Sequence, residues 1–385
     1  MSELRGQLLI GGRIVPGVLR FSGERIASIG IDAPPPQDAN LPLVAPGFVD
    51  LHIHGFDGHD PVDELPQMAA ALARVGTTAF QATMFPAAPK ELGLIAEQVW
   101  QRAQSCNSST AGAAMARIVG LHLEGPFVNP LRAGALPKEV LAEPSLASLR
   151  EIVGPSTGGG RGIRTVTLAP ELKGSSDLIS ELVHLGIHVS LGHSAATSED
   201  ARKASRAGAV GATHLFNAMS GIHHREVGLA GFALTSNALY AELIGDLVHV
   251  GADAIRLALA ARGPKGLCLV SDALKGAGHG CDVFHWHGRE HERHDGAWYY
   301  RESAGAARKL AGSALCQLEM LQQLVRQGVV SVEEALTMAT ETPARALGLE
   351  RELGSLAPGL RADIVVLDPR TLELKSVLVG GRVAL

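Results

Sequence analysis

Cysteine is scarce in this sequence, with four residues in 385, and no two of them form a CxxC pair. This spacing argues against both a disulfide framework and a thiolate zinc site, so we expect reduced thiols. Long apolar runs are also missing, because no stretch approaches the roughly 18 uninterrupted apolar residues of a membrane span. The opening residues, MSELRGQLLIGGRIV, lack a basic region followed by a long apolar core. We therefore expect a soluble, cytoplasmic protein.

A surplus of positive charge is absent as well, since the formal net charge is -5 and the isoelectric point is near 6.3. Nucleic acids and anionic membranes are bound by clustered Lys and Arg, so neither is an expected partner. Any recognition of phosphate must be local. Aromatic residues make up only 4%, whereas 45 glycines indicate many tight turns, as in an α/β enzyme with many strand-to-helix loops.

The two ends of the chain resemble each other in pattern. Within residues 1–46, the segments QLLIGGRIV, VLRFSG and RIASIG are short strand candidates separated by turns that contain glycine. Residues 346–385 again alternate short apolar stretches with Gly and Pro turns. Because chain ends often lie close together, we expect both ends to form one small β-sandwich domain.

The middle of the chain, residues 47–345, predicts a (β/α)8 TIM barrel. Stretches rich in Ala, Leu, Glu and Arg, such as DELPQMAAALARVG, separate most of its short apolar runs, which is the rhythm of alternating strands and helices. Eight of these runs are candidates for buried parallel strands: 47–55, 77–85, 116–125, 163–171, 188–193, 211–217, 241–250 and 267–273.

Five polar residues with metal-ligating side chains lie in or at the ends of four of these runs. His52 and His54 are spaced i, i+2, which places both imidazoles on one face of a strand. Glu124, His193 and His214 come from three further runs. A carboxylate with two neutral imidazoles is a common zinc ligand set that leaves a position open for water. Taken singly, each has a plainer explanation, since Glu124 could cap a helix and the histidines could be buried and bonded to backbone.

Asp272 ends the eighth run, in the segment LVSDA. A carboxylate beside a metal can take a proton from water and pass it to a poor leaving group such as an amine. We therefore predict that Asp272 is the general base and acid. The alternative is that Asp272 caps a following helix.

Several long motifs in a fixed order resemble the N-acetylglucosamine-6-phosphate deacetylase family of the amidohydrolase superfamily. They are APGFVDLHIHG, HLEGPF, VTLAPE, LGHSAAT, THLFNAMSG, REVGLAG, LVSDA, LAGSAL and, near the end, PARALGL with GSLAPGLRADIVVLD. The resemblance implies a barrel with a small β-sandwich, a metal held by Glu124, His193 and His214, and Asp272 as acid and base. Some members hold a second metal on the pair that corresponds to His52 and His54.

The resemblance also implies the substrate contacts. Arg225 would clamp the phosphate through its bidentate guanidinium, and in the family this arginine reaches across a subunit interface, which implies a homodimer. On sequence alone, Arg225 could equally be a solvated charge. The remaining implied contacts are Asn217, Ala218, His249, Leu310, Ala311 and Gly312.

Two features depart from the family pattern. Leu136 stands where the family commonly has His or Gln, and a leucine can neither donate a hydrogen bond nor polarise a carbonyl. The segment 281–300 contains four closely spaced histidines, which we expect on the solvated face of a β-hairpin: His285, His287, His291 and His294.

The predicted reaction is the deacetylation of N-acetylglucosamine 6-phosphate to glucosamine 6-phosphate and acetate. The N-acetylgalactosamine epimer is the nearest alternative, and Leu136 keeps it open. A cyclic-amide hydrolase would want a lysine at the end of the fourth run, where VTLAPE has none. A non-catalytic sugar phosphate sensor would be expected to lose the proton shuttle or metal ligands. His and carboxylate ligands suit zinc first, and also iron, cobalt and manganese, as one ion or two.

Overall fold

The computed structural model describes residues 1–32, 41–108, 114–154, 160–301 and 308–385. Its centre is an eight-stranded parallel sheet with the strand order β12-β11-β10-β9-β8-β7-β6-β5. Asp272 N–H donates to His52 O at 2.8 Å and His54 N–H donates to Ala273 O at 3.0 Å, so the ends of β12 and β5 join and the sheet closes. The strands are β5 (Phe48–Ile53), β6 (Thr77–Met84), β7 (Arg117–Glu124), β8 (Ile163–Leu168), β9 (His188–Leu191), β10 (Gly211–Ala212), β11 (Tyr240–Ile244) and β12 (Leu267–Val270).

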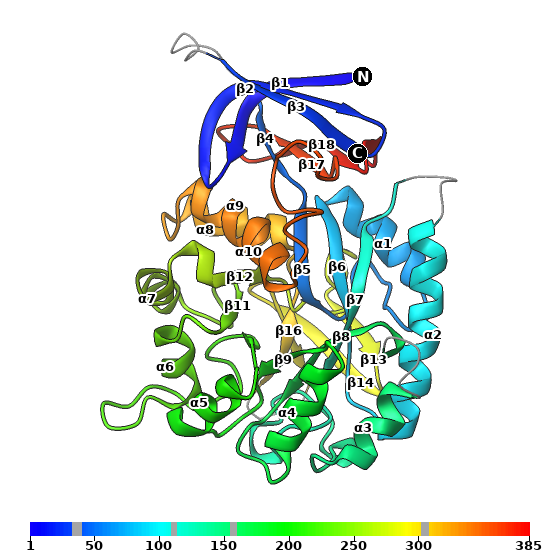
Figure 1. Cartoon of the computed structure of the whole chain (residues 1–385), viewed down its shortest axis with the longest axis vertical. Helices are drawn as coiled ribbons and strands as arrows, with labels where there is room; N and C mark the ends of the chain where they lie inside the picture. The colour runs from blue at the N-terminus through cyan, green and yellow to red at the C-terminus, as the bar shows by residue number, and fades with distance from the viewer. Residues whose placement is uncertain (33–40, 109–113, 155–159, 302–307) are drawn as a thin grey trace.

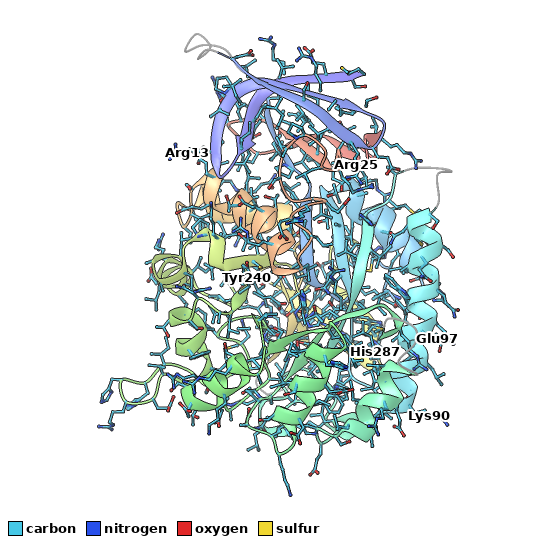
Figure 2. The ribbon with its side chains drawn as sticks, in the orientation of Figure 1. Arg13, Arg25, Lys90, Glu97, Tyr240 and His287 are labelled. Carbon is cyan, nitrogen blue, oxygen red and sulfur yellow. The ribbon has the colours of Figure 1, made fainter. Side chains whose placement is uncertain are left out.

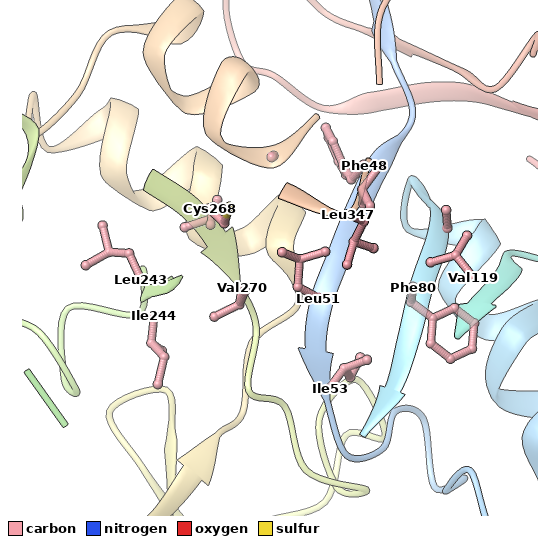
Figure 3. Close-up of a cluster of buried hydrophobic side chains, with 14 of the residues drawn as sticks. Phe48, Leu51, Ile53, Phe80, Val119, Leu243, Ile244, Cys268, Val270 and Leu347 are labelled. Carbon is pink, nitrogen blue, oxygen red and sulfur yellow. The ribbon is translucent and has the colours of Figure 1, made fainter. Parts of the chain in front are cut away.

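Each of the eight predicted runs therefore overlaps a barrel strand, and the predicted fold is confirmed. The strands are short and buried on both faces, which is why they appear in the sequence as continuous apolar runs. Figure 3 shows Leu51 and Ile53 of β5, Val270 of β12 and Ile244 of β11 among the buried apolar side chains of the barrel. The apolar core thus holds the strands in place beneath the polar residues at their ends.

Helices surround the barrel, as Figure 1 shows. The Thr197 side chain caps α5 by accepting from Asp200 N–H, and Ser331 caps α9 in the same way from Glu334 N–H. None of the helices in the described ranges is both long and apolar enough to cross a bilayer. The helices are α1 (Leu65–Arg74), α2 (Pro89–Ser108), α3 (Leu146–Val153), α4 (Ser175–His184), α5 (Ser198–Arg206), α6 (Gly228–Thr235), α7 (Ala252–Arg262), α8 (Gln317–Arg326), α9 (Val332–Ala339) and α10 (Glu341–Ala346).

The two ends of the chain pair in one seven-stranded sheet, ordered β19-β18-β17-β4-β1-β2-β3. The sheet has an apolar core of its own. Ile26 N–H donates to Leu360 O at 2.9 Å, which links the N-terminal part of the chain to its C-terminal part. Figure 1 shows this sheet as a layer at one end of the barrel, with both termini in it. Its strands are β1 (Ser2–Ile10), β2 (Arg13–Ser22), β3 (Arg25–Ile31), β4 (Leu43–Pro46), β17 (Ile364–Leu367), β18 (Leu374–Val379) and β19 (Arg382–Val383).

A single residue, Gly47, connects the terminal sheet to the barrel. β4 ends at Pro46 and β5 begins at Phe48. A Cβ on Gly47 would lie 2.1 Å from Thr78 Oγ1, so only glycine fits there. Gly47 N–H donates to Asp363 O at 2.9 Å, which ties this junction to the segment before β17.

A third sheet, four-stranded and antiparallel, is inserted after β12. It comprises β13 (Val283–Trp286), β14 (Arg289–His294), β15 (Ala297–Tyr300) and β16 (Lys309–Ser313). Figure 2 shows His287, at the turn between β13 and β14, in the barrel part of the molecule, whereas Arg13 and Arg25 lie in the terminal sheet.

The predicted hairpin is present as β13 and β14, but the predicted solvated face is wrong for His291. Its side chain is buried and stacks on Phe284, with ring centroids 4.5 Å apart, because its cross-strand neighbours Phe284 and Tyr300 flank it on the same face of the inserted sheet. His285 is exposed and pairs with Glu290 at 2.9 Å, as a solvated residue would.

Candidate active site

The predicted site residues lie at the carboxyl end of the barrel, away from the terminal sheet. Figure 3 shows the arrowheads of β5 and β6 pointing to this end. His52 lies in β5 and His54 directly follows it, while Glu124 is the last residue of β7. The other three residues each lie two positions beyond the end of their strand, namely His193 after β9, His214 after β10 and Asp272 after β12.

These last three residues share an uncommon backbone conformation. The φ angles of His193, His214 and Asp272 are 46°, 31° and 47°, in the left-handed region that residues other than glycine rarely adopt. Such residues persist where their surroundings hold them, often at functional sites. Two backbone hydrogen bonds hold Asp272 in this conformation. Its N–H donates to His52 O, and its carbonyl accepts from Ser313 N–H at 2.9 Å.

Glu124 lies at the centre of the histidine cluster. Its Oε1 is 2.9 Å from His193 Nε2 and 3.0 Å from His214 Nε2. The same carboxylate approaches His54 Nε2 at 3.2 Å and His52 Nε2 at 3.5 Å. All five side chains are buried, so these contacts are made with little access to water.

Hydrogen bonds on the far side of two rings fix which nitrogen faces the cluster. His193 Nδ1 is 2.9 Å from the carbonyl of Arg132, and a carbonyl can only accept, so the proton of a neutral His193 is on Nδ1. His52 Nδ1 donates in the same way to Glu242 Oε2 at 3.0 Å. Burial, the largest cause, lowers the pKa of His52 well below 6.5 and keeps this ring neutral. Both rings therefore turn the lone pair of Nε2 toward Glu124.

The cluster is thus a set of acceptor atoms that need a positive charge between them. His193 Nε2 and His214 Nε2 lie only 3.0 Å apart beside the Glu124 carboxylate. Burial alone would lower the pKa of His214, but the hydrogen bond and charge of Glu124 raise it to about 9. Without another cation, a proton on His214 supplies that charge. The donor set fits a divalent metal ion.

Two groups of ligand atoms are close enough for a metal, with their atoms within 4.8 Å of one another. One is Glu124, His193 and His214, and the other is His52, His54 and Glu124. Both fit the predicted ligands, and Glu124 would be shared between them.

A third grouping, of His52, His122 and Glu242, does not offer a free ligand atom at His122. His122 Nδ1 donates to Leu51 O at 3.2 Å, and its Nε2 accepts from Thr167 Oγ1 at 2.7 Å. Burial lowers the pKa of His122 to about 3, so the ring stays neutral. We interpret His122 as a satisfied core histidine.

Asp272 lies beside the histidine pair of β5. Its Oδ1 is 3.6 Å from His54 Nε2 and 3.7 Å from His52 Nε2. Burial and then the charge on Glu124 raise the pKa of Asp272 well above 3.8, so this carboxyl can hold a proton. The chain after Asp272 forms turns and then β13, so the alternative role as a helix cap does not apply.

A cavity of about 340 Å³ opens over the cluster. Its wall includes Arg132 and Phe85, and Leu136, which is buried against Val128 and Ala133. Among the residues predicted to contact substrate, the structure places Asn217, Ala218, His249, Leu310, Ala311 and Leu136 in this wall.

Two predicted contacts lie outside the cavity wall. Arg225 belongs to an exposed loop, residues 221–226, and in Figure 1 a loop stands out from the body beside α5 and α6. Gly312 is buried in β16, where a Cβ would meet Leu274 and the carbonyl of Asp272. Gly312 thus lies behind Asp272 and permits close packing there.

The sequence analysis missed two acidic residues on β11 and in the loop that follows it. Glu242 is buried, holds His52 Nδ1, and also accepts from His214 N–H at 3.3 Å. Asp246 is fully buried and lies 2.6 Å from His249 Nδ1. The available signal was a charged residue at two positions of the apolar run AELIGDLVHV, where a buried charge needs a partner.

Comparison with known proteins gives the family. The model of the "Amidohydrolase family" matches residues 43–384. N-acetylgalactosamine-6-phosphate deacetylase of Escherichia coli O157:H7 is 34% identical over 95% of this chain and 94% of its own. N-acetylglucosamine-6-phosphate deacetylase of Bos taurus is also 34% identical, over 96% of this chain and 89% of its own.

A solved structure agrees with these relatives. A mutant of N-acetyl-D-glucosamine-6-phosphate deacetylase from Mycobacterium smegmatis, in complex with N-acetyl-D-glucosamine-6-phosphate, superposes with a TM-score of 0.86 at 31% identity. It covers 100% of this chain and 99% of its own. The resemblance inferred from the motifs is confirmed. This chain belongs to the amidohydrolase family, alongside the amino sugar phosphate deacetylases, and is a hydrolase of linear amide bonds.

Proposed function

We propose that this chain is a metal-dependent deacetylase of an N-acetyl amino sugar 6-phosphate, with N-acetylglucosamine 6-phosphate as its first candidate substrate. The observation that carries the proposal is the convergence of Glu124, His193 and His214 on one point beside Asp272. The names of the relatives support the substrate class. They include one deacetylase of the galactosamine epimer, so N-acetylgalactosamine 6-phosphate is the second candidate.

Glu124, His193 and His214 would hold the ion, and His52 and His54 would hold a second one with Glu124. A divalent ion there would lower the pKa of water and polarise the acetyl carbonyl. Zinc is the first candidate for these ligands, with iron, cobalt and manganese as alternatives. Burial of the cluster strengthens each of its electrostatic contacts.

Asp272 performs the proton transfers in this proposal. Its Oδ1 takes a proton from the water that attacks the carbonyl carbon, and then delivers it to the amide nitrogen as the C–N bond breaks. Acetate and the free amine result. A raised pKa suits this role, because the carboxyl must carry the proton between the two steps.

The sugar is assigned to the side of Asn217, Ala218 and His249, which line the cavity. Leu136 presents an apolar surface where relatives are predicted to have a polar side chain, so the carbonyl would rely on the ion. Arg225 is proposed as the phosphate clamp of a neighbouring subunit in a homodimer, since its exposed loop does not enter the cavity of its own chain.

The test is a screen for acetate release from N-acetyl amino sugars with and without the 6-phosphate, on protein of measured metal content. We expect turnover of the phosphorylated sugars, with a loss of at least about 1,000-fold in kcat for Asp272→Asn at unchanged metal content. Full activity of that variant would remove Asp272 from the mechanism.

The phosphate clamp has its own measurement. Arg225→Ala should raise KM for the phosphorylated substrate and leave KM for the unphosphorylated sugar unchanged. If neither changes, Arg132 in the cavity wall becomes the candidate clamp.

A further inference from the structure

A second cavity lies beside the first and is larger, about 440 Å³. The two share four wall residues, His54, Phe85, Ala135 and Ala311. The second cavity is bounded by the loop after β5, the end of β6, the start of α2 and the inserted sheet. Its volume lies in the range of roughly 300–1,000 Å³ in which pockets hold whole small molecules. An acetyl methyl group, about the size of one water, would leave it nearly empty.

We propose that this second cavity binds the acyl group of the substrate, and that the enzyme therefore hydrolyses amides of linear acyl chains longer than acetyl. The inference rests on the proposed function and specifies its substrate class.

The barrel topology places this cavity on the acyl side of the reacting carbon. In the closed order of eight strands, β6 lies four places from β10, which is directly across the barrel. The proposed sugar contacts Asn217 and Ala218 follow β10, whereas Phe85 follows β6. An amide carbon carries its nitrogen on one side and its acyl chain on the other. When the sugar lies toward β10, the acyl chain of the substrate extends toward β6 and into the second cavity.

The two cavities meet at a wall formed by the four residues that they share. Phe85 lies flat on the His54 ring, with centroids 4.0 Å apart and planes 7° apart, and meets Trp286 edge-on at 5.3 Å. Phe85 is thus held as a partition. Ala135 and Ala311, the other shared residues, have the smallest side chains of the wall, and in this proposal the acyl chain passes between the cavities beside them.

The interior of the second cavity suits a hydrocarbon chain. Its apolar wall includes Val62, Met84, Ile95, Val140 and Leu274.

Two of its polar groups already have partners. Asp60 binds Lys275 Nζ at 3.2 Å, and Tyr300 donates its hydroxyl to the carbonyl of Ala135 at 2.9 Å. An acyl chain would therefore displace water from apolar surface without breaking either bond, and each buried methylene contributes about a factor of four to binding.

The test compares kcat/KM across N-acetyl, N-propanoyl, N-butanoyl and N-hexanoyl glucosamine 6-phosphate by release of the amine. We expect the N-butanoyl compound to be cleaved within tenfold of the N-acetyl one. Turnover of the N-acetyl compound with a loss of more than tenfold for N-butanoyl would overturn the acyl cavity and leave the proposed function standing. Failure to cleave any member of this series or of the matching N-acyl galactosamine 6-phosphates would overturn both.

Substitutions that fill the second cavity provide a second test of the proposal. Val140→Trp should lower the ratio of kcat/KM for N-hexanoyl over N-acetyl by at least tenfold, while the matched Val140→Ala should not lower it. Ile95→Phe, on α2, fills the cavity from another side and serves if Val140→Trp melts at a much lower temperature. A ratio equal to wild type in a folded filling variant would overturn the proposal.

Discussion

Glu242 gives the sharpest prediction, because one carboxylate contacts two residues of the proposed metal site. It accepts from His52 Nδ1 at 3.0 Å and from His214 N–H at 3.3 Å, in a buried position. A hydrogen bond to a charged group contributes about 1.5–3 kcal/mol. If holding the His52 ring in place depends on that bond, Glu242→Ala should weaken metal binding by roughly 10- to 150-fold, at about 1.36 kcal/mol per factor of ten.

Glu242→Gln separates charge from geometry. Its amide oxygen still accepts from His52 Nδ1, so we expect a loss of about tenfold, as for a neutral in place of a charge-assisted hydrogen bond. Metal affinity would be measured by competition with a chromogenic chelator. Asp363→Asn is the matched control, because Asp363 is a buried carboxyl in the segment before β17, at the terminal sheet. An affinity unchanged in both Glu242 variants, or lowered equally by Asp363→Asn, would refute the reasoning.

Three further predictions concern stability. Hydrogen bonds from His249 outweigh burial and lower the pKa of Asp246 below 3.8. The ionised carboxylate of Asp246 therefore stabilises the folded protein fully above pH 3.8, and this contribution fades at lower pH. The difference in urea midpoint between wild type and Asp246→Asn should be larger at pH 7 than at pH 3.5, and an equal difference would contradict this. Phe48→Ala should lower the free energy of unfolding by about 3–5 kcal/mol and lower the melting temperature, because Phe48 is fully buried. Leu94→Ala, at a half-exposed residue, should barely change the melting temperature. Equal shifts would argue against a core role of Phe48. Zinc added after chelation should raise the melting temperature, because an ion at 100 times its Kd adds about 2.7 kcal/mol to the free energy of unfolding. No rise would count against the proposed metal site.

The barrel was predictable because its strands are buried on both faces. Each strand left an apolar run in the sequence, and the polar residue at the end of a run marked the site. The lengths of the strands could be predicted less well from the sequence. The run 211–217 contains only Gly211–Ala212 as strand, because the backbone of His214 adopts a left-handed conformation. The spacing of apolar residues gives no sign of that conformation.

Contacts between distant elements could not be predicted from periodicity. Glu242 lies within an apolar run, so nothing in its neighbours shows that it contacts His52, two strands away in the closed barrel. His291 was placed on the wrong face because the burial of a hairpin side chain depends on its neighbours in the sheet, here Phe284 and Tyr300 on the strands at either side. The second cavity has no sequence signal at all, since its wall combines residues from β5 to β16.

The single-residue junction at Gly47 has a consequence for the order of assembly during synthesis. β4 is flanked in its sheet by β1 and β17, and more than 300 residues separate Pro46 from Ile364. One edge of β4 therefore stays open while the whole barrel is being made. Gly47, directly before β5 and its His52, gains its hydrogen-bond partner only once Asp363 has been made, because Asp363 O accepts from Gly47 N–H. The junction that leads into the strand of His52 is thus secured by a segment that is synthesised after the whole barrel.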